Sequence, residues 1–197
     1  MRGRPKSFDR EQALDAALGV FWEKGFGATA IGDLTASMGI GRQSLYDTFG
    51  DKHALFLEAL RRYTEMHLAE MRTIFESDGS PFENIRAVFA RMKQEALDGT
   101  CGCMMVNSST ELGAHDDGAA RLIEKTTVRM EGLFREQLER ARDAGELTDA
   151  ASPRALSRLI VDTANGLAAR SRLGLDEEEI EDVFDALIGL MAKPPAP

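Results

Sequence analysis

Apolar residues recur along this chain at spacings of three and four residues, the period of an α-helix with one buried face. Near the start, Leu14, Ala17, Leu18 and Phe21 follow this spacing, and no run of strand length alternates between apolar and polar residues. The pattern predicts an all-α fold of about nine helices. We expect them at about residues 9–25, 30–37, 42–48, 51–76, 81–97, 104–112, 119–142, 153–172 and 176–191.

Start and stop signals set these boundaries. Side chains that can accept hydrogen bonds from the first free amides of a helix stand before four of the segments, and glycines follow the first three. The four capping residues are Asp9, Asp51, Ser80 and Asp176. The stretch Ser77-Asp78-Gly79-Ser80 is the clearest internal boundary. We therefore expect an N-terminal domain over residues 1–55, a connecting helix over 51–76 and a second domain over 77–197.

Residues 29–49 contain the clearest functional pattern. Two short helices flank a tight turn at Met38-Gly39-Ile40-Gly41, the layout of a helix-turn-helix. Arg42, Gln43 and Tyr46 share one outward side of the second helix. An arginine can bridge guanine, a glutamine can bridge adenine and a tyrosine can reach a phosphate, so this side suits the major groove. An ordinary helical hairpin with a polar outer face remains the alternative.

Charge is distributed unevenly. The chain has a formal net charge of -9, with 24 basic and 33 acidic residues. Residues 1–62 hold nine basic and eight acidic residues, which leaves fifteen basic and twenty-five acidic residues for the remainder. Such an asymmetry allows one end to bind a polyanion while the acidic remainder limits non-specific attachment. A solvated surface with a basic tail would give the same count.

The run TAIGDL at 29–34, the pair GI at 39–40 and the run SLYDTFGDKHAL at 44–55 closely resemble the N-terminal domain of TetR-type transcriptional regulators. The resemblance implies a three-helix DNA-binding domain followed by a helical domain that binds a small molecule and dimerises. It also implies phosphate contacts from Thr29, Tyr46 and Lys52, and positions at or near the bases for Arg42, Gln43 and Ser44.

Three departures from the family pattern lie at the turn and the start of the recognition helix. Gly41 replaces the usual Ser or Thr, Met38 stands where a small residue is usual, and Gln43 often corresponds to Gly. The class is unaffected, but the operator sequence cannot be read from these residues. The basic segment before the first helix, which includes Arg4, resembles the core of an AT-hook, whose arginines follow the minor groove. Its alternative is a basic leader that adds only salt-dependent affinity.

The second domain is acidic and rich in methionine, as an adaptable binding cavity can be. The candidate lining residues are Met92, Met105, Asn107, Met130 and Asn165. Core packing for the methionines and surface positions for the polar residues are the alternative. Cys103 stands at a predicted helix start, where a lowered pKa would make it a redox sensor, or it packs as a small apolar residue. Cys101, Cys103 and His115 fall short of a closed metal site, so we expect no metal.

The last two helices have wide apolar faces that favour a homodimer with a four-helix interface. We therefore expect a DNA-binding regulator, with repression favoured, that binds a palindromic operator in double-stranded DNA under the control of a small-molecule effector. The sequence lacks a P-loop, a nucleophile elbow and a dinucleotide fingerprint, so we expect no enzyme, no catalytic residues and no cofactor. With no apolar stretch near the ~20 residues of a spanning helix, we expect a cytoplasmic protein without a membrane partner. The alternative function is a helical adaptor that binds proteins without specific DNA binding.

Overall fold

The computed structural model describes residues 8–98, 101–113, 115–148 and 152–193. These residues form nine α-helices and one isolated bridge between Leu147 and Ala192, without a strand, which confirms the all-α prediction. The helices are α1 (Arg10–Ala28), α2 (Ile31–Met38), α3 (Arg42–Phe49), α4 (Lys52–Phe75), α5 (Pro81–Asp98), α6 (Met104–Leu112), α7 (Asp117–Asp143), α8 (Pro153–Ser171) and α9 (Glu177–Met191).

The helix starts that were predicted from capping residues are confirmed. Asp9 accepts hydrogen bonds from the amides of Glu11 and Gln12, and Asp51 accepts one from Ala54 at 2.7 Å. The capping boxes that begin α5 and α9 are also formed, between Ser80 and Glu83 and between Asp176 and Glu179. Each cap is made within three or four residues, which explains why the sequence reveals it.

The start of α7 differs from the prediction. The helix begins at Asp117 and not at residue 119, because the Asp116 carboxylate accepts hydrogen bonds from the amides of Gly118 at 2.9 Å and Ala119 at 3.0 Å. This cap satisfies the amides of the first turn and draws Gly118 into the helix. The connection between α6 and α7 is therefore shorter than the gap between the expected helices at 104–112 and 119–142.

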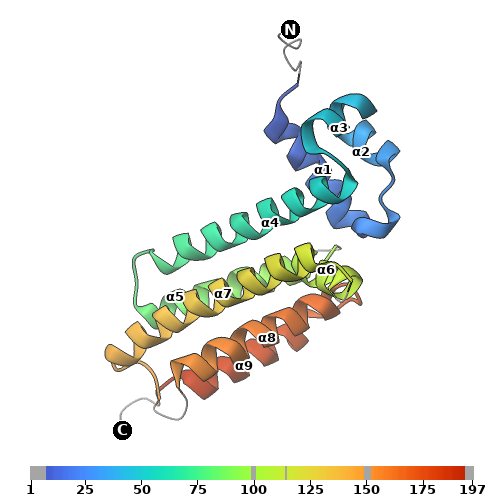
Figure 1. Cartoon of the computed structure of the whole chain (residues 1–197). Helices are drawn as coiled ribbons and strands as arrows, with labels where there is room; N and C mark the ends of the chain where they lie inside the picture. Colours follow the sequence, from blue (N-terminus) through green and yellow to red (C-terminus); the bar gives the residue numbers. More distant parts are fainter. Residues whose placement is uncertain (1–7, 99–100, 114, 149–151, 194–197) are drawn as a thin grey trace.

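Helices α1, α2 and α3 gather at one end of the molecule around the first half of α4 (Figure 1). Their common core contains Phe21 of α1, Leu34 of α2, Leu45 of α3 and Phe56 of α4, all at most 1% exposed. Met104 and Met105 of α6 and Ala119 of α7 belong to the same core. The α2–α3 unit therefore rests on α1, and α1 in turn contacts α6.

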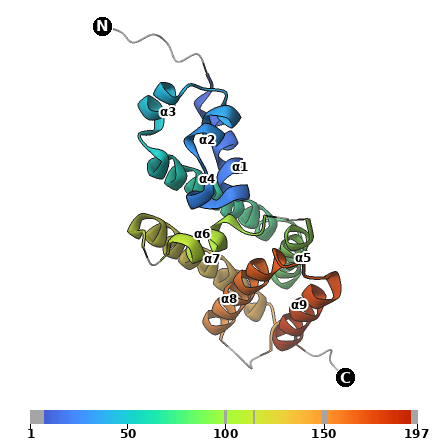
Figure 2. The ribbon, with the colours of Figure 1, turned by 90° about the vertical axis from the view of Figure 1, so that its right-hand side faces the viewer.

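The remaining helices form a second core. The end of α4 packs with α5, α7, α8 and α9, and the rings of Phe89 and Phe184 stack with their centroids 5.0 Å apart. Figure 2 shows α8 and α9 together on the side away from α1–α3. Helix α4 contributes to both cores, so it connects the two parts of the chain.

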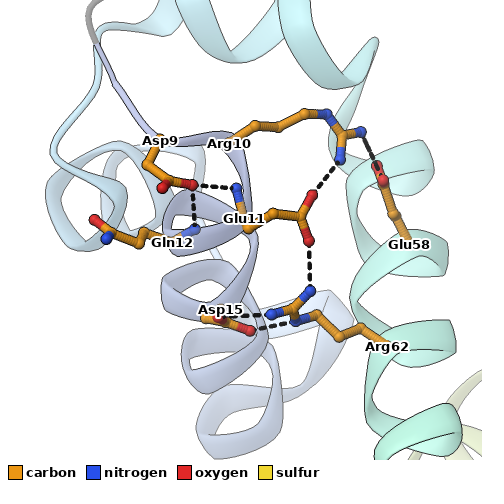
Figure 3. Close-up of polar contacts among 7 residues, drawn as sticks. All are labelled: Asp9, Arg10, Glu11, Gln12, Asp15, Glu58 and Arg62. Carbon is orange, nitrogen blue, oxygen red and sulfur yellow. Dashed lines mark hydrogen bonds and ion pairs between the residues drawn. The ribbon is translucent and has the colours of Figure 1, made fainter.

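A network of ion pairs fastens α1 to α4 (Figure 3). Arg10 binds both carboxylate oxygens of Glu58, at 2.6 and 2.8 Å. Arg62 binds Glu11 at 2.6 Å and forms a two-point contact with Asp15. These side chains are partly exposed, so each pair is weak alone, but linked bidentate pairs hold the two helices in a defined register.

Candidate nucleic-acid interface and effector cavity

The α2–α3 unit has the geometry of a helix-turn-helix. Helix α2 ends at Gly39, which adopts the left-handed conformation with φ of 64° and donates its amide to Thr35. A non-glycine residue is rarely accommodated there, so Gly39 allows the sharp turn that brings α3 back across α2. Leu45 and Phe49 face the core, which leaves the other side of α3 to solvent.

The predicted recognition residues lie on this outer side. Arg42 and Gln43 are exposed, Tyr46 is 44% exposed and Ser44 is half-buried. The side-chain amide nitrogen of Gln43 donates to the carboxylate of Asp47 at 2.8 Å. A contact from the Gln43 side-chain nitrogen to a base therefore requires this bond to open first. No ion pair holds Arg42 among the described residues, and its guanidinium is available for a ligand.

Thr29 does not present its hydroxyl as predicted. The residue is 2% exposed, and its hydroxyl donates to the carbonyl oxygen of Gly25 at 2.5 Å. The nearby amide of Ala30 donates to Asp33 at 3.0 Å, and Lys24 pairs with the same carboxylate. The Ala30 amide and Lys24 both lower the pKa of Asp33. A negative charge therefore already caps the N-terminus of α2, and the prediction that the Thr29 hydroxyl contacts phosphate is wrong for this conformation.

Lys52 lies in the first turn of α4, where the prediction placed it. Its ammonium group stands 4.5 Å from the centre of the Phe26 ring, a cation–π contact that orients the side chain. Arg4 and the rest of the basic segment fall outside the described residues.

A cavity of about 490 Å³ opens between the two parts of the chain. Four of the five candidate lining residues, Met92, Met105, Met130 and Asn165, line this cavity, whereas Asn107 does not. The Asn107 amide donates to the carbonyl oxygen of Cys101 at 2.7 Å and borders a smaller cavity of about 270 Å³. The larger volume lies within the range of small-molecule sites.

Polar groups that the sequence analysis missed gather on the α4 and α5 walls of the larger cavity. Glu95 lies 2.9 Å from Arg91 and 3.4 Å from His67, and Arg91 also pairs with Glu70 at 2.5 Å. Burial raises the pKa of Glu95 even though His67 and Arg91 oppose this effect. The ligand atoms of His67, Glu70 and Glu95 lie within 4.8 Å of one another, but Arg91 already supplies their carboxylates with a cation.

Comparison with known proteins identifies the chain. A family model described as bacterial regulatory proteins of the tetR family matches residues 13–59, and a Tetracyclin repressor-like C-terminal domain matches residues 82–187. The chain belongs to the TetR family. Its relatives are transcriptional regulators that bind DNA and are not enzymes, so this TetR-family member is a DNA-binding transcriptional regulator.

The relatives cover nearly the whole chain. The HTH-type transcriptional regulator YezE of Bacillus subtilis (strain 168) is 34% identical over 192 residues, which cover 96% of this chain and 99% of YezE. The HTH-type transcriptional repressor ComR of Escherichia coli (strain K12) is 28% identical over 192 residues, which cover 96% of this chain and 91% of ComR.

Solved structures share the fold. A cysteine mutant of the TetR-family regulator CifR, complexed with 26-bp double-strand operator DNA, superimposes with a TM-score of 0.84 at 25% identity and covers 96% of this chain and 100% of its own. The reduced form of NemR from E. coli gives a TM-score of 0.86 at 18% identity, with 95% of this chain and 98% of its own covered.

The redox-sensor hypothesis requires a lowered pKa for the Cys103 thiol, and the surroundings of this thiol do not lower it. A helix N-terminus alone would lower its pKa, and the amides of Met105 and Val106 do act in that direction, as does the Tyr63 hydroxyl. Burial is the larger effect and raises the pKa of Cys103 in this TetR-family protein. The neutral thiol is therefore favoured at neutral pH.

The polar residues of the cavity wall on α4 and α5 could be recognised in the sequence only by their spacing. Tyr63 and His67 are four residues apart on α4, and Arg91 and Glu95 are four apart on α5, so each pair shares a helix face. Nothing in the sequence indicates that these faces turn toward each other across a cavity.

No helix in the described part of this regulator is long and apolar enough to cross a membrane.

Proposed function

We propose that this regulator is a homodimeric repressor that binds a palindromic operator and responds to a small-molecule effector. In this proposal residues 1–55 bind DNA, α4 connects, and residues 77–197 provide dimerisation and most of the effector site. The main support is the exposed side of α3, where Arg42, Gln43 and Tyr46 stand free of the core in a helix-turn-helix. The structure of the related CifR in complex with operator DNA supports DNA binding by a protein of this fold.

The role proposed for each residue follows from where it lies. Arg42, Gln43 and Ser44 read bases or lie beside them, because they begin the recognition helix α3. Tyr46, exposed on α3, and Lys52, in the first turn of α4, hold phosphates. Arg4 reaches the minor groove from the basic segment. Met92, Met105, Met130 and Asn165 contact the effector, and the cavity volume of about 490 Å³ supports this assignment. Such an effector changes DNA affinity only if it binds one conformation more tightly.

Exposed leucines on the last helices support the dimer. Leu159 of α8 is 44% exposed and Leu190 of α9 is 59% exposed, as apolar residues at an interface are in an isolated protomer. Twofold symmetry then places two recognition helices in successive major grooves about 34 Å apart.

Selection of bound duplexes from a random pool at near-physiological salt tests the proposal. A palindromic consensus is expected from a twofold regulator, and that duplex then serves to screen effectors for release. An unenriched pool from folded protein would contradict sequence-specific binding. A single half-site without symmetry would retain DNA binding but contradict the dimeric arrangement.

A further inference from the structure

Helix α6 is fastened to α1 at both of its ends. At the start of α6, the indole nitrogen of Trp22 donates to the carbonyl oxygen of Gly102 at 2.6 Å. At the other end, the carboxylate of Glu111 accepts hydrogen bonds from the amides of Phe26 at 3.0 Å and Gly27 at 2.6 Å. The partners are at least 80 residues apart in sequence, so these bonds join the N-terminal helices to the second half of the chain.

Glycines make the second of these contacts possible. A Cβ atom at Gly25 would lie 2.8 Å from one oxygen of Glu111, and a Cβ atom at Gly27 would lie 3.0 Å from the other. Gly25 also has a φ of 79°, which breaks the helical conformation and turns the following amides outward. The end of α1 is therefore shaped to receive the carboxylate of Glu111.

The same face of α1 forms part of the cavity. Leu18 and Trp22 line it together with Gly102, Cys103 and Met105 at the start of α6. The Trp22 ring meets the Tyr63 ring edge-on, with centroids 5.2 Å apart. A ligand in this cavity consequently lies against a helix of the DNA-binding end without any intermediate element.

Helix α1 also contacts the helix-turn-helix directly, without an intermediate element. Phe26 and Gly27 come just before α2, and Phe21 of α1 shares a core with Leu34 of α2 and Leu45 of α3. Because that core is closely packed, a change in how α6 rests on α1 is passed on to the α2–α3 unit. Figure 2 shows α6 beneath the end of α1.

We propose that Trp22 and Glu111 are positioning residues that couple occupancy of the cavity to the geometry of the helix-turn-helix. The inference rests on the proposed effector control. An effector that displaces Trp22 weakens its bond to Gly102, loosens the start of α6 and shifts the amides that Glu111 holds in front of α2. Binding of operator DNA and the order of α6 are then linked, and the linkage is reciprocal.

This reciprocity allows a test that needs no effector. Amide hydrogen exchange of α6 is measured with and without a saturating selected operator duplex, in the wild type, Trp22→Phe and Glu111→Gln. Trp22→Phe keeps a ring and removes the donor, and Glu111→Gln keeps the shape and removes the charge on an exposed side chain. Glu124→Gln, the same change on an exposed glutamate of α7, is the matched control.

In the wild type and Glu124→Gln, operator DNA is expected to change α6 exchange by about 3- to 10-fold, the range that corresponds to one net hydrogen bond. In Trp22→Phe and Glu111→Gln this response is expected to be lost while the circular dichroism of the free protein stays unchanged. Two outcomes would contradict the coupling role of Trp22 and Glu111 while leaving DNA binding intact. In the first, the hydrogen exchange of α6 in the wild type is the same with and without operator; in the second, folded Glu111→Gln keeps the full response. If no duplex is bound at all, the proposed function fails, and the inference falls with it.

Discussion

Arg42 is the side chain on which sequence discrimination most depends, because it is exposed at the first position of α3 and no ion pair holds it among the described residues. We expect Arg42→Ala to cost about 1–3 kcal/mol of discrimination between the selected operator and a duplex with one base pair changed, if the guanidinium is bidentate to guanine. Titrations of both duplexes at fixed salt measure this difference. Arg121→Ala, an exposed arginine of α7, is the control, and equal discrimination by wild type and Arg42→Ala would remove Arg42 from base reading.

The Cys103 thiol has a raised pKa because burial outweighs its hydrogen bonds, one of which comes from the Tyr63 hydroxyl. Removing that hydroxyl in Tyr63→Phe removes a group that lowers the pKa, so the pKa of Cys103 should rise further. We expect the pH profile of iodoacetamide alkylation, measured in a Cys101→Ser background, to shift to higher pH in Tyr63→Phe. A profile that moves to lower pH would show that the hydroxyl does not stabilise the thiolate.

At the residue level, the sequence could predict which side chains of α3 are exposed. The period of α3 places Arg42, Gln43 and Tyr46 opposite the buried Leu45, and a periodic pattern contains that information. Thr29 was misjudged because its hydroxyl donates to the carbonyl oxygen of Gly25, whose backbone is non-helical inside α1. A periodic pattern does not reveal this bond, because it depends on the positive φ of 79° that Gly25 adopts within α1.

At the level of elements, Asp116 has two roles, as the cap of α7 and as the partner of His53 on α4. We expect Asp116→Ala to lower the free energy of unfolding by about 1 kcal/mol, the usual cost of losing an N-cap, as measured by urea titration. Asp117→Ala, which removes a highly exposed neighbouring carboxylate, is the control and should have little effect. An equal loss in both variants would assign the effect to charge at the helix end and not to the cap.

The pH dependence of this effect has a definite sign. The Ala119 amide, followed by His53, lowers the pKa of Asp116 below its ordinary value of 3.8. A lowered pKa in the folded state means that the ionised carboxylate stabilises the fold above pH 3.8, and that this contribution is lost as the pH falls through the folded-state pKa. The difference between wild type and Asp116→Ala should therefore be present above pH 3.8 and shrink as the pH falls into the acid range.

Capping chemistry explains why most element boundaries could be predicted. The caps of α1, α4, α5 and α9 join residues at most three positions apart, and these helices begin within a residue of their expected starts. The start of α7 was missed because Asp116, Asp117 and Gly118 form a composition typical of turns. The observed cap shows that the same residues can begin a helix when one carboxylate meets two amides.

For the whole molecule, the proposed dimer predicts a particle of about twice the 21.6 kDa chain mass in sedimentation measurements. Because Leu159 and Leu190 are exposed apolar residues on α8 and α9, we expect Leu159→Glu with Leu190→Glu to shift the protein toward monomer and to weaken binding of a palindromic operator. Val128→Glu, a similar change on α7, is the control. A wild-type monomer at micromolar concentration would contradict the arrangement.

The cavity is a property of the whole molecule, which limits what the sequence could predict about it. Met92, Met105, Met130 and Asn165 were anticipated from composition, but the walls also include Trp22 and Tyr63 from the first third of the chain. A cavity of this kind depends on how α1, α4 and the later helices come together in space. The sequence was divided at residue 77 because a turn lies there. The cavity and the α1–α6 contact, however, are each formed by residues from both sides of this boundary.

Trp22 is the one tryptophan of this chain, and its indole nitrogen is bonded across the α1–α6 contact. Its emission spectrum therefore reports on that contact and not on the centre of either core. Contacts between parts of a protein open with a smaller free energy than the cores unfold. On heating, the emission should shift before the far-ultraviolet circular dichroism falls. Two melting curves that do not coincide would then show that the α1–α6 contact opens before the helices unfold, and would not indicate an error in either measurement.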